Sequence, residues 1–381
     1  MGDDFAPAPP PSDITHLVRE RTDARANRNW ARADELKAQI EAAGWRVVDR
    51  GKRSSVHPAA PVSVEVDGER RYGSAADVPN GWVAPATAPF TVAIVASEEP
   101  ARVSRLLAAL RDHAPAGTQV VVVENDPSAA QTQALSANAP DRAPIGGAEP
   151  EVLRTSVRLG YAAALNIALR RATGEVVLLA DGSAVPTGDA FAKLHEALTD
   201  PEVVVAGAYG LLAEEGVPLR PHELERATPD PDADLEVAAI EGAWLAFRRA
   251  DLIELGTIEE HFVTPAWLDV WLSLRLRTGA MEPSGDESEA ADEDDPTEDT
   301  SNGARDGVDV AEAGTEPDSD GPAGTVDQAP DAADLPAPKR ALMIDLPLAR
   351  DETAWPPDRT RLNRRNMYRV LDTFGWRDDL A

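Results

Sequence analysis

The 381-residue sequence contains no cysteine. This absence excludes disulfide bonds, thiolate nucleophiles and metal sites with cysteine ligands. The six histidines form neither an HExxH motif nor a close pair, so a histidine-based zinc site is not indicated. A G-x-S-x-G motif is also missing, and no Gly-rich phosphate loop follows the first predicted strand. The sequence therefore argues against hydrolases with a nucleophile elbow, P-loop NTPases and nicotinamide-dependent dehydrogenases.

Long hydrophobic runs are absent as well. The longest apolar stretches, such as residues 203–213, are shorter than the roughly 18 residues that a membrane-spanning helix needs. The first residues include Asp3, Asp4 and several prolines, unlike the basic and then apolar order of a signal peptide. Hydrophobic residues still make up 43% of the chain, enough for a sizeable core. We expect a cytoplasmic protein without a membrane span.

Positive charge is scarce, with 37 Lys and Arg against 67 Asp and Glu and a net charge of −30. This excess opposes non-specific binding to nucleic acid or anionic membranes. Much of it lies in residues 282–334, where 19 Asp and Glu accompany a single Arg and large apolar side chains are nearly missing. The composition predicts a disordered segment, either a self-repelling linker, which is the commoner case, or a block that recruits a basic partner. Because apolar sequence resumes at Ala341, we expect residues 282–340 to be an insertion that interrupts a domain.

The N-terminal part of the chain has the pattern of a helical hairpin over residues 12–57. Ser12 or Asp13 is suited to cap a first helix, and Asn29 is suited to cap a second. In the second helix, apolar residues recur at three- and four-residue spacing up to Gly44, which favours a helix stop. Around this hairpin we expect a disordered arm at residues 1–11 and, at residues 58–89, a connector with a short β-hairpin that turns at Asp67-Gly68.

Residues 90–281 alternate between buried strands and amphipathic helices, and residues 341–381 are expected to complete the same domain. Near-continuous Val, Ile and Leu runs are typical of parallel strands that are covered on both faces. The predicted strands are residues 91–97, 118–125 and 174–181, and the predicted helices are residues 103–113 and 160–172. The fold class is therefore α/β, with three layers and a mostly parallel sheet, joined to an N-terminal α-helical hairpin.

Polar residues follow each of the three predicted strands. The strand ends read Ser97-Glu98, Glu124-Asn125-Asp126 and Asp181-Gly182-Ser183. In an open parallel sheet the ligand crevice lies beyond the carboxyl ends of the strands, so we expect these residues to meet there. Carboxylates in such a crevice bind a nucleoside or hold a divalent cation that neutralises a pyrophosphate. The same residue types are also common in ordinary turns, which is the competing interpretation.

The order of several motifs resembles the inverting glycosyltransferases of family 2, which have the GT-A nucleotide-diphospho-sugar transferase fold. The most similar stretch is LGYAAALNIALRRATGEVVLLAD at residues 159–181, and residues 241–262 and 267–279 resemble the family's acceptor-side segment and its Glu-Asp helix. The resemblance implies transfer of a sugar from a nucleotide-diphospho-sugar to an unidentified acceptor, with Asp269 as the catalytic base. By the same resemblance, the nucleotide-sugar-binding residues are Ser97, Glu124, Asn125, Asn166, Asp181 and Ser183, and the acceptor side comprises Glu241, Gly242 and Trp244.

Two departures from the family fall at the positions that carry the chemistry. The D-x-D metal motif is replaced by Asp181-Gly182-Ser183, so Asp181 is the only carboxylate left there for a Mg²⁺ or Mn²⁺ cofactor. An Arg or Lys is an alternative partner for the phosphates. In the Glu-Asp motif Leu268 replaces Glu, which leaves Asp269 as the base or, alternatively, as a helix-start carboxylate that faces solvent. The competing function is a non-catalytic GT-A-like module that docks RNA or protein through the N-terminal hairpin or the acidic insertion.

Residues 21–55 resemble the C-terminal tail helices of cysteinyl-tRNA synthetases, with Trp30, Ala33-Asp34 and Gly44 among the shared positions. In the synthetase this piece belongs to the tRNA-binding end, so the resemblance implies RNA as a partner of the hairpin. Arginines at three- and four-residue spacing are more often a solvated helix surface, and that interpretation stays open. No catalytic part of a synthetase is present, so aminoacylation is excluded. The basic residues concerned are Arg19, Arg21, Arg25, Arg28, Arg32, Lys52 and Arg53.

Overall fold

The structure is a computed structural model. It describes residues 10–50, 53–59, 61–96, 100–125, 144–214, 216–242, 244–279, 337–351, 357 and 360–380. The expectations for Ser97, for most of the N-terminal arm and for residues 282–336 of the acidic insertion lie outside these ranges. After the insertion the chain returns to the compact unit that contains the residues before it.

The N-terminal segment contains the expected pair of helices, α1 (Ser12–Ala26) and α2 (Trp30–Ala42). The Asn29 side chain caps α2 by accepting the Arg32 N–H at 3.2 Å, as predicted. The predicted cap of α1 is wrong, because α1 begins directly after Pro11 and no side chain caps it. The sequence analysis also missed an antiparallel pair of strands that follows Gly44, β1 (Trp45–Arg50) and β2 (Arg53–Pro58). These elements share small apolar clusters, whose buried members are Ile14, Ala24, Ala33, Leu36, Ile40 and Val47.

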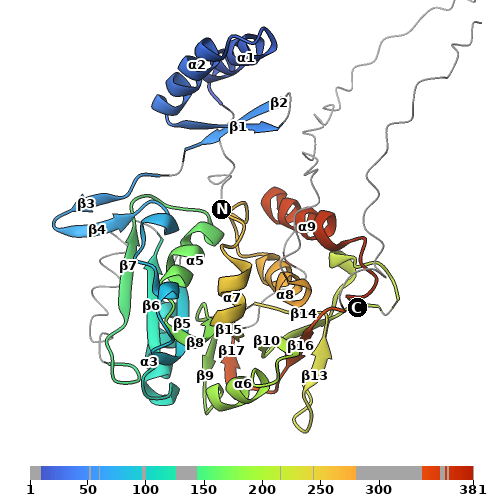
Figure 1. Cartoon of the computed structure of the whole chain (residues 1–381). Coiled ribbons are helices and arrows are strands. Elements are labelled where there is room, and N and C mark those ends of the chain that lie inside the picture. The colour runs from blue at the N-terminus through green and yellow to red at the C-terminus, as the bar shows by residue number, and fades with distance from the viewer. Residues whose placement is uncertain are drawn as a thin grey trace, which may run out of the picture. The chain divides into compact units, whose positions relative to one another are not determined.

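A ten-stranded mixed sheet forms the centre of the larger domain, in the order β13-β16-β10-β15-β8-β5-β6-β7-β4-β3 (Figure 1). Strands β4, β7, β6, β5 and β8 run parallel to one another, and β15 is antiparallel to both of its neighbours. The strands are β3 (Val64–Val66), β4 (Glu69–Tyr72), β5 (Ala88–Ala96), β6 (Gln119–Glu124), β7 (Glu151–Thr155), β8 (Gly174–Leu179), β10 (Val203–Gly207), β13 (Leu235–Val237), β15 (Leu245–Arg248) and β16 (Arg340–Met343).

Helices cover both faces of this sheet because the strand side chains alternate between two apolar cores. On β5, Val92 and Ile94 pack in the core that includes residues of α3 and α6, whereas Ala93 and Val95 pack in the core formed with α5, α7, α8 and α9. The predicted three-layer α/β arrangement with a mostly parallel sheet is therefore confirmed. The helices are α3 (Pro100–His113), α5 (Tyr161–Arg170), α6 (Phe191–Ala197), α7 (Arg249–Leu255), α8 (Leu268–Thr278) and α9 (Arg361–Phe374).

The short hairpin of the predicted connector is part of the main sheet. Asp67 and Gly68 form its turn with positive φ angles of 53° and 79°, as the Asp-Gly pair predicts. Strand β4 then pairs in parallel with β7. Residues 64–72 thus extend the edge of the sheet.

Short strands outside the central sheet form small accessory sheets. One contains β11 (Gly210–Leu212), β12 (Glu225–Arg226) and β14 (Ala239–Ile240). Another pairs β9 (Ala184–Pro186) with β17 (Leu348–Arg350). Short 3-10 helices are found at Ala75–Asp77, Gly81–Val83 and Pro221–Glu223.

Strand β16 follows the acidic insertion and lies between β10 and β13. The two ends of the insertion are held together, because Lys339 N–H donates to the Arg277 carbonyl and Arg277 Nε donates to the Lys339 carbonyl, both at 2.8 Å. Among the residues that the structure describes, no helix is long and apolar enough to cross a membrane.

Candidate functional site

The Asp181-Gly182-Ser183 segment forms a tight turn just beyond the carboxyl end of β8. Asp181 Oδ1 accepts the Ser183 N–H at 2.8 Å and the Ser183 hydroxyl at 2.6 Å. Gly182 has a φ of 81°, and a Cβ there would lie 2.6 Å from the Arg102 carbonyl oxygen, so the turn requires glycine. The side chain of Asp181 is exposed and that of Ser183 is buried. The turn therefore presents one carboxylate to the crevice.

Asp269 lies at the start of α8 and is partly buried, not directed into open solvent. Its Oδ1 accepts the Val270 N–H at 2.9 Å, and its Oδ2 accepts the N–H of Gly242. Burial raises the pKa of Asp269 to about 7, opposed by the two backbone hydrogen bonds and assisted by the nearby Glu241 carboxylate. A carboxylate with a pKa near neutrality is suited to accept a proton from a hydroxyl group.

Tyr161 is influenced by the charges of both Asp181 and Asp269, and the sequence analysis did not identify it. It is the first residue of α5, and its backbone N–H donates to the Val263 carbonyl at 3.1 Å. The pKa of its phenol is raised, mainly by burial and further by the charges of Asp181 and Asp269. Since both charges act on the same phenol, Asp181 and Asp269 both lie near Tyr161, whose hydroxyl stays protonated.

Glu241 lies beside this crevice and carries the largest ionic cluster at the site. Its carboxylate is only 6% exposed and accepts Arg226 Nε and Nη2 at 2.7 and 2.6 Å. Arg350 Nη2 donates to the same carboxylate at 3.0 Å, and the Arg350 guanidinium lies 3.7 Å from the centre of the Tyr209 ring. The Glu241 carboxylate is thus held by two guanidinium groups, those of Arg226 and Arg350.

Two of the residues that the resemblance assigns to the nucleotide sugar form hydrogen bonds to the backbone of distant segments. Asn125 donates to the Leu159 carbonyl and accepts the Leu159 N–H, both at 2.9 Å. Asn166 forms the same pair of bonds with Ile258, at 2.8 and 2.9 Å. Both side chains are 2% exposed and their amides bond to backbone groups, so each of them holds a loop in place, and their contact with the nucleotide sugar stays a prediction.

Glu124 is likewise enclosed. It is 3% exposed, and its carboxylate accepts Arg154 Nε at 2.7 Å. Arg154 also bonds to Glu69, so one guanidinium joins the end of β6 to the hairpin at the edge of the sheet. The expected contact between Glu124 and a nucleoside is therefore not supported by its surroundings.

The expected acceptor-side residues differ from one another in their burial and in the groups that they contact. Gly242 has a φ of 68° and donates its N–H to Asp269, which connects this segment with the candidate base. Trp244 is fully buried, and its indole donates to the Ala184 carbonyl at 3.0 Å, so it supports the site from inside. Trp244 and Trp267 have φ values of 67° and 69°, which are rare for bulky residues and are typical of functional loops.

The chemistry of the donor set does not fit a divalent cation. Within the described residues, no three His, Asp or Glu side chains are grouped as a metal site would require. At the D-x-D position, one oxygen of Asp181 already accepts two hydrogen bonds from Ser183, whose neutral hydroxyl is a poor ligand for a hard cation. Asp181 is therefore an isolated carboxylate, and the expected Mg²⁺ or Mn²⁺ ligand set is incomplete.

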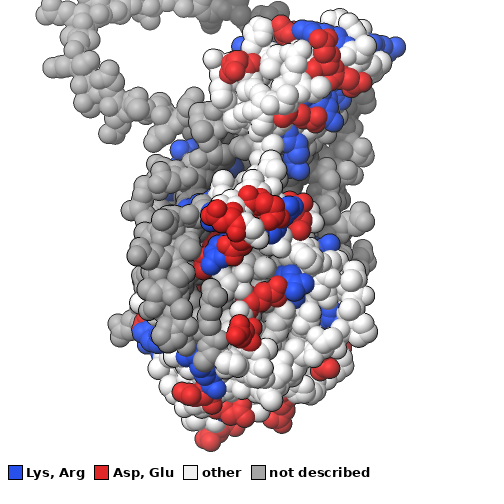
Figure 2. Space-filling view, turned by 90° about the vertical axis from the view of Figure 1, so that its left-hand side faces the viewer, with Lys and Arg blue, Asp and Glu red and all other residues white. Residues whose placement is uncertain are grey.

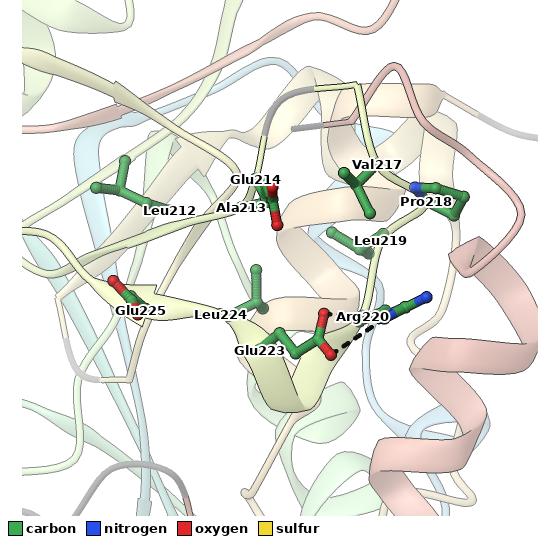
Figure 3. Close-up of a pocket in the computed structure, with 10 residues that line it drawn as sticks. All are labelled: Leu212, Ala213, Glu214, Val217, Pro218, Leu219, Arg220, Glu223, Leu224 and Glu225. Carbon is green, nitrogen blue, oxygen red and sulfur yellow. Dashed lines mark hydrogen bonds and ion pairs between the residues drawn. The ribbon is translucent and has the colours of Figure 1, made fainter.

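A separate pocket of about 380 Å³ lies between the segment around residues 212–220 and the one at 223–225 (Figure 3). It contains none of the residues predicted for the site, and its lining combines Leu and Val side chains with Glu214, Glu223 and Glu225. Figure 3 shows Arg220 and Glu223 facing each other in an ion pair, with a distance of 3.2 Å. A second pocket, lined in part by His195 and Arg248, also contains none of the predicted residues.

Charges of both signs are mixed on the N-terminal helices. Arg32 lies 3.2 Å from Glu20 and 2.9 Å from Glu35, and Arg21 is buried. In the upper part of Figure 2, where α1 and α2 lie, blue and red side chains alternate and do not separate into a basic face. This arrangement agrees better with a solvated helix surface than with a continuous basic surface.

The class of protein follows from the strand order, the crevice at the ends of the parallel strands and a comparison with known families. Residues 91–256 match the model of glycosyl transferase family 2, and residues 10–56 match that of the cysteinyl-tRNA ligase anticodon binding domain. Both resemblances expected from the sequence are therefore confirmed for these segments. Residues 91–256 of the larger domain thus resemble glycosyl transferase family 2, and the domain has the three-layer α/β arrangement expected from that resemblance.

Solved structures with a similar fold have low sequence identity. The mannosyltransferase PcManGT from Pyrobaculum calidifontis, solved with GDP-Man and Mn²⁺, is 22% identical over 53% of this chain and 55% of its own, with a TM-score of 0.36. GalNAc-T7, solved with UDP, GalNAc and Mn²⁺, is 11% identical over 75% of this chain and 48% of its own, with a TM-score of 0.47. The chain thus spans about half the length of each. A comparison with curated proteins finds no match.

Proposed function

We propose that the larger domain transfers a sugar from a nucleotide-diphospho-sugar to a hydroxyl group of an acceptor, with inversion at the anomeric carbon. The observation that carries this proposal is the Asp269 carboxylate, which is held by two backbone amides, has a pKa near 7 and lies, like Asp181, near Tyr161. The match of residues 91–256 to glycosyl transferase family 2 supports the reaction class.

In the proposed reaction the acceptor hydroxyl attacks the anomeric carbon and Asp269 takes its proton. The bond between the anomeric carbon and the diphosphate breaks, and the electron pair leaves with the nucleoside diphosphate. The Gly242 and Val270 amides hold the carboxylate in one orientation, which favours a single line of attack. Tyr161 is available as a neutral hydrogen-bond donor on the side of Asp181.

The test is a thermal-shift screen of UDP- and GDP-sugars, followed by measurement of the nucleoside diphosphate released. A bound donor stabilises the protein by about 2.7 kcal/mol at a hundredfold excess over Kd. Asp269→Asn should keep the shift and lose turnover, whereas Asp372→Asn, an exposed control on α9, should keep both. Without a shift from any nucleotide sugar, the non-catalytic alternative would be the better description.

A second candidate function, RNA binding by the N-terminal segment, is favoured by the match of residues 10–56 to an anticodon binding domain. The full chain should then bind tRNA at low salt, with an affinity that falls steeply as salt rises. Arg25→Ala and Arg32→Ala should flatten this dependence, and Arg340→Ala in the larger domain serves as the control. Because Arg32 already pairs with Glu20 and Glu35, RNA would have to displace these carboxylates. Equal binding by all three variants would assign the tRNA contact elsewhere.

A further inference from the structure

The reaction proposed above requires a contact with the sugar that is transferred, and the residues assigned so far do not supply one. Asp181 is expected on the donor side, and Asp269 is expected to take the proton of the acceptor. The sugar joins these two places, because its anomeric carbon is bonded to the diphosphate and is attacked by the acceptor hydroxyl. A side chain near both carboxylates is therefore well placed to contact the sugar.

Tyr161 is such a side chain. Its phenol is close enough to Asp181 and Asp269 for both charges to act on it. The residue is partly buried, and its ring packs against the apolar core that also contains Trp267 and Leu268, which precede Asp269. The position of Tyr161 near the candidate base thus follows from packing as well as from electrostatics.

The backbone fixes Tyr161 at the start of α5. Its N–H donates to the Val263 carbonyl at 3.1 Å, and the N–H of Ala162 donates to the Phe262 carbonyl at 2.9 Å. Phe262 is fully buried, and its ring centre lies 5.5 Å from that of Trp271. Because the first turn of the helix is bonded to a packed segment, the phenol is oriented before a ligand binds.

The hydroxyl of Tyr161 forms no hydrogen bond with any residue in the part of the chain that the structure describes. In the free protein such a hydroxyl bonds to water, which a hydroxyl group of a ligand can replace. Burial and the two neighbouring charges raise the pKa of the phenol, so it stays neutral and is suited to neither acid nor base catalysis. The chemistry that it offers is a hydrogen bond to a neutral group.

We propose that the Tyr161 hydroxyl bonds to a ring hydroxyl of the transferred sugar and thereby contributes to the choice of donor. This inference rests on the proposed function, since it assumes that the domain accepts a nucleotide sugar. A site that bonds a substrate hydroxyl discriminates against the analogue without it, because the polar group of the site is then left unpaired. Tyr161 is thus a specificity-determining residue for the sugar and not a part of the nucleotide site.

The test uses calorimetry on the full chain, with the UDP- and GDP-sugars that stabilise it in the thermal-shift screen and with UDP and GDP. Tyr161→Phe should weaken the Kd of the nucleotide sugar by about 3- to 10-fold, as expected for one lost hydrogen bond, and leave the Kd of the nucleoside diphosphate unchanged. Tyr72→Phe is the matched control, because Tyr72 is also partly buried against the same core but lies on β4. Both variants should keep the melting temperature of the ligand-free wild type.

Sugar analogues in which one ring hydroxyl at a time is replaced by hydrogen identify the bonded group. One of these analogues should bind the wild type several-fold more weakly than the parent nucleotide sugar. The same analogue should bind the wild type and Tyr161→Phe equally well, because the analogue no longer has the hydroxyl that Tyr161 bonds.

The outcomes separate this inference from the proposed function. An unchanged Kd of the nucleotide sugar in Tyr161→Phe, or an equal loss for the nucleotide sugar and its nucleoside diphosphate, would overturn the role of Tyr161 and leave sugar transfer standing. A lower melting temperature of ligand-free Tyr161→Phe would also overturn it, since the hydroxyl would then have a partner within the protein. If no UDP- or GDP-sugar binds, both proposals fail.

Discussion

We expect the activity proposed for this protein to depend on pH near neutrality through Asp269. Burial raises its pKa to about 7, so the carboxylate is largely protonated at pH 6 and largely ionised at pH 8. We expect kcat/KM to rise through this range and to level off above it, because only the ionised form accepts a proton. Asp269→Asn should lower kcat by about 10²- to 10⁴-fold and abolish the rise of kcat/KM between pH 6 and 8. A pH profile that keeps its midpoint in the variant would show that another group is the base.

The same pKa predicts how Asp269 affects stability. Its pKa is higher in the folded chain than in the unfolded one, so the folded state binds the extra proton between about pH 4 and 7. The stabilising contribution is complete below this range and is lost as the pH rises through it. The melting temperature of the wild type should therefore fall relative to that of Asp269→Asn as pH increases from 5 to 8. A constant difference between the two proteins would contradict the raised pKa.

Ser183 tests whether the turn after β8 occupies the metal position of the family. Ser183→Asp restores a second carboxylate beside Asp181, in a buried place where two negative charges repel each other. We expect Mn²⁺ to raise the melting temperature of this variant and to leave that of the wild type unchanged. Ser183→Ala is the control, since it removes the hydroxyl without adding a ligand. No response of Ser183→Asp to Mn²⁺ would mean that the turn lies away from the diphosphate.

Sequence reasoning found the residues of the site that belong to local motifs and missed those that are distant in the chain. Asp181 was predicted from its place after a predicted strand, whereas Gly242 and Asp269 came from the family resemblance, and the roles of all three stay predictions. Tyr161 was not predicted, since only the folded chain brings α5 close to the two carboxylates. The amides of Asn125 and Asn166 were interpreted as ligand contacts because a sequence does not show which backbone groups engage them.

Helix α9 orients the segment that leads to the candidate base. Asn366 is 1% exposed, and its Nδ2 donates to the Ala266 carbonyl and to the Thr264 hydroxyl, both at 3.0 Å. These bonds hold the residues just before Trp267 and Asp269. Asn363 of the same helix adds a further bond, because its Oδ1 accepts the Thr264 hydroxyl at 2.9 Å, so α9 holds this segment through two side chains.

Replacement of Asn366 by Ala should therefore lower kcat by about tenfold or more while the Kd of the donor stays the same, since a small displacement of the base slows the transfer. Turnover assays measure kcat, and calorimetry on the same samples measures the Kd of the donor. Tyr368→Ala, an exposed position on the same helix, is the control. If Asn366→Ala loses stability but keeps kcat, the residue is only structural.

At the level of elements, the apolar pattern located β5, α3, β6, α5 and β8 to within a few residues, but it missed strand β7. The wholly apolar strands β5 and β6 were recognisable because both of their faces are buried. The pair β1 and β2 was missed because its composition, with Arg and Asp on β1 and Arg, Ser and Pro on β2, resembles a loop. Strand β15 runs against its neighbours, a feature that depends on where the chain turns and not on its apolar pattern.

For the whole molecule, the acidic segment should contribute little to the stability of the domain that it interrupts. Its ends are already joined by the hydrogen bonds between Arg277 and Lys339, so a shorter link can replace it. Replacing residues 282–334 by a short Gly/Ser linker should change the melting temperature by no more than about 3 °C, since each halving of loop length is worth only about 0.6 kcal/mol. A Gly/Ser segment of the original length separates the effect of charge from that of length. A loss of several degrees in either variant would show that the native segment stabilises the domain.

The position of β16 between β10 and β13 also determines the order in which the domain is completed during synthesis. When α8 has left the ribosome, β10 still has one unpaired edge, and residues 280–336 must be translated before β16 can fill it. At about 5–20 residues per second, this interval lasts several seconds. An unpaired strand edge is an aggregation hazard, but the residues made in this interval include the 19 acidic ones of the insertion. Because like charges repel, we expect these residues to oppose association of unfinished chains until the last strand of the sheet has been made.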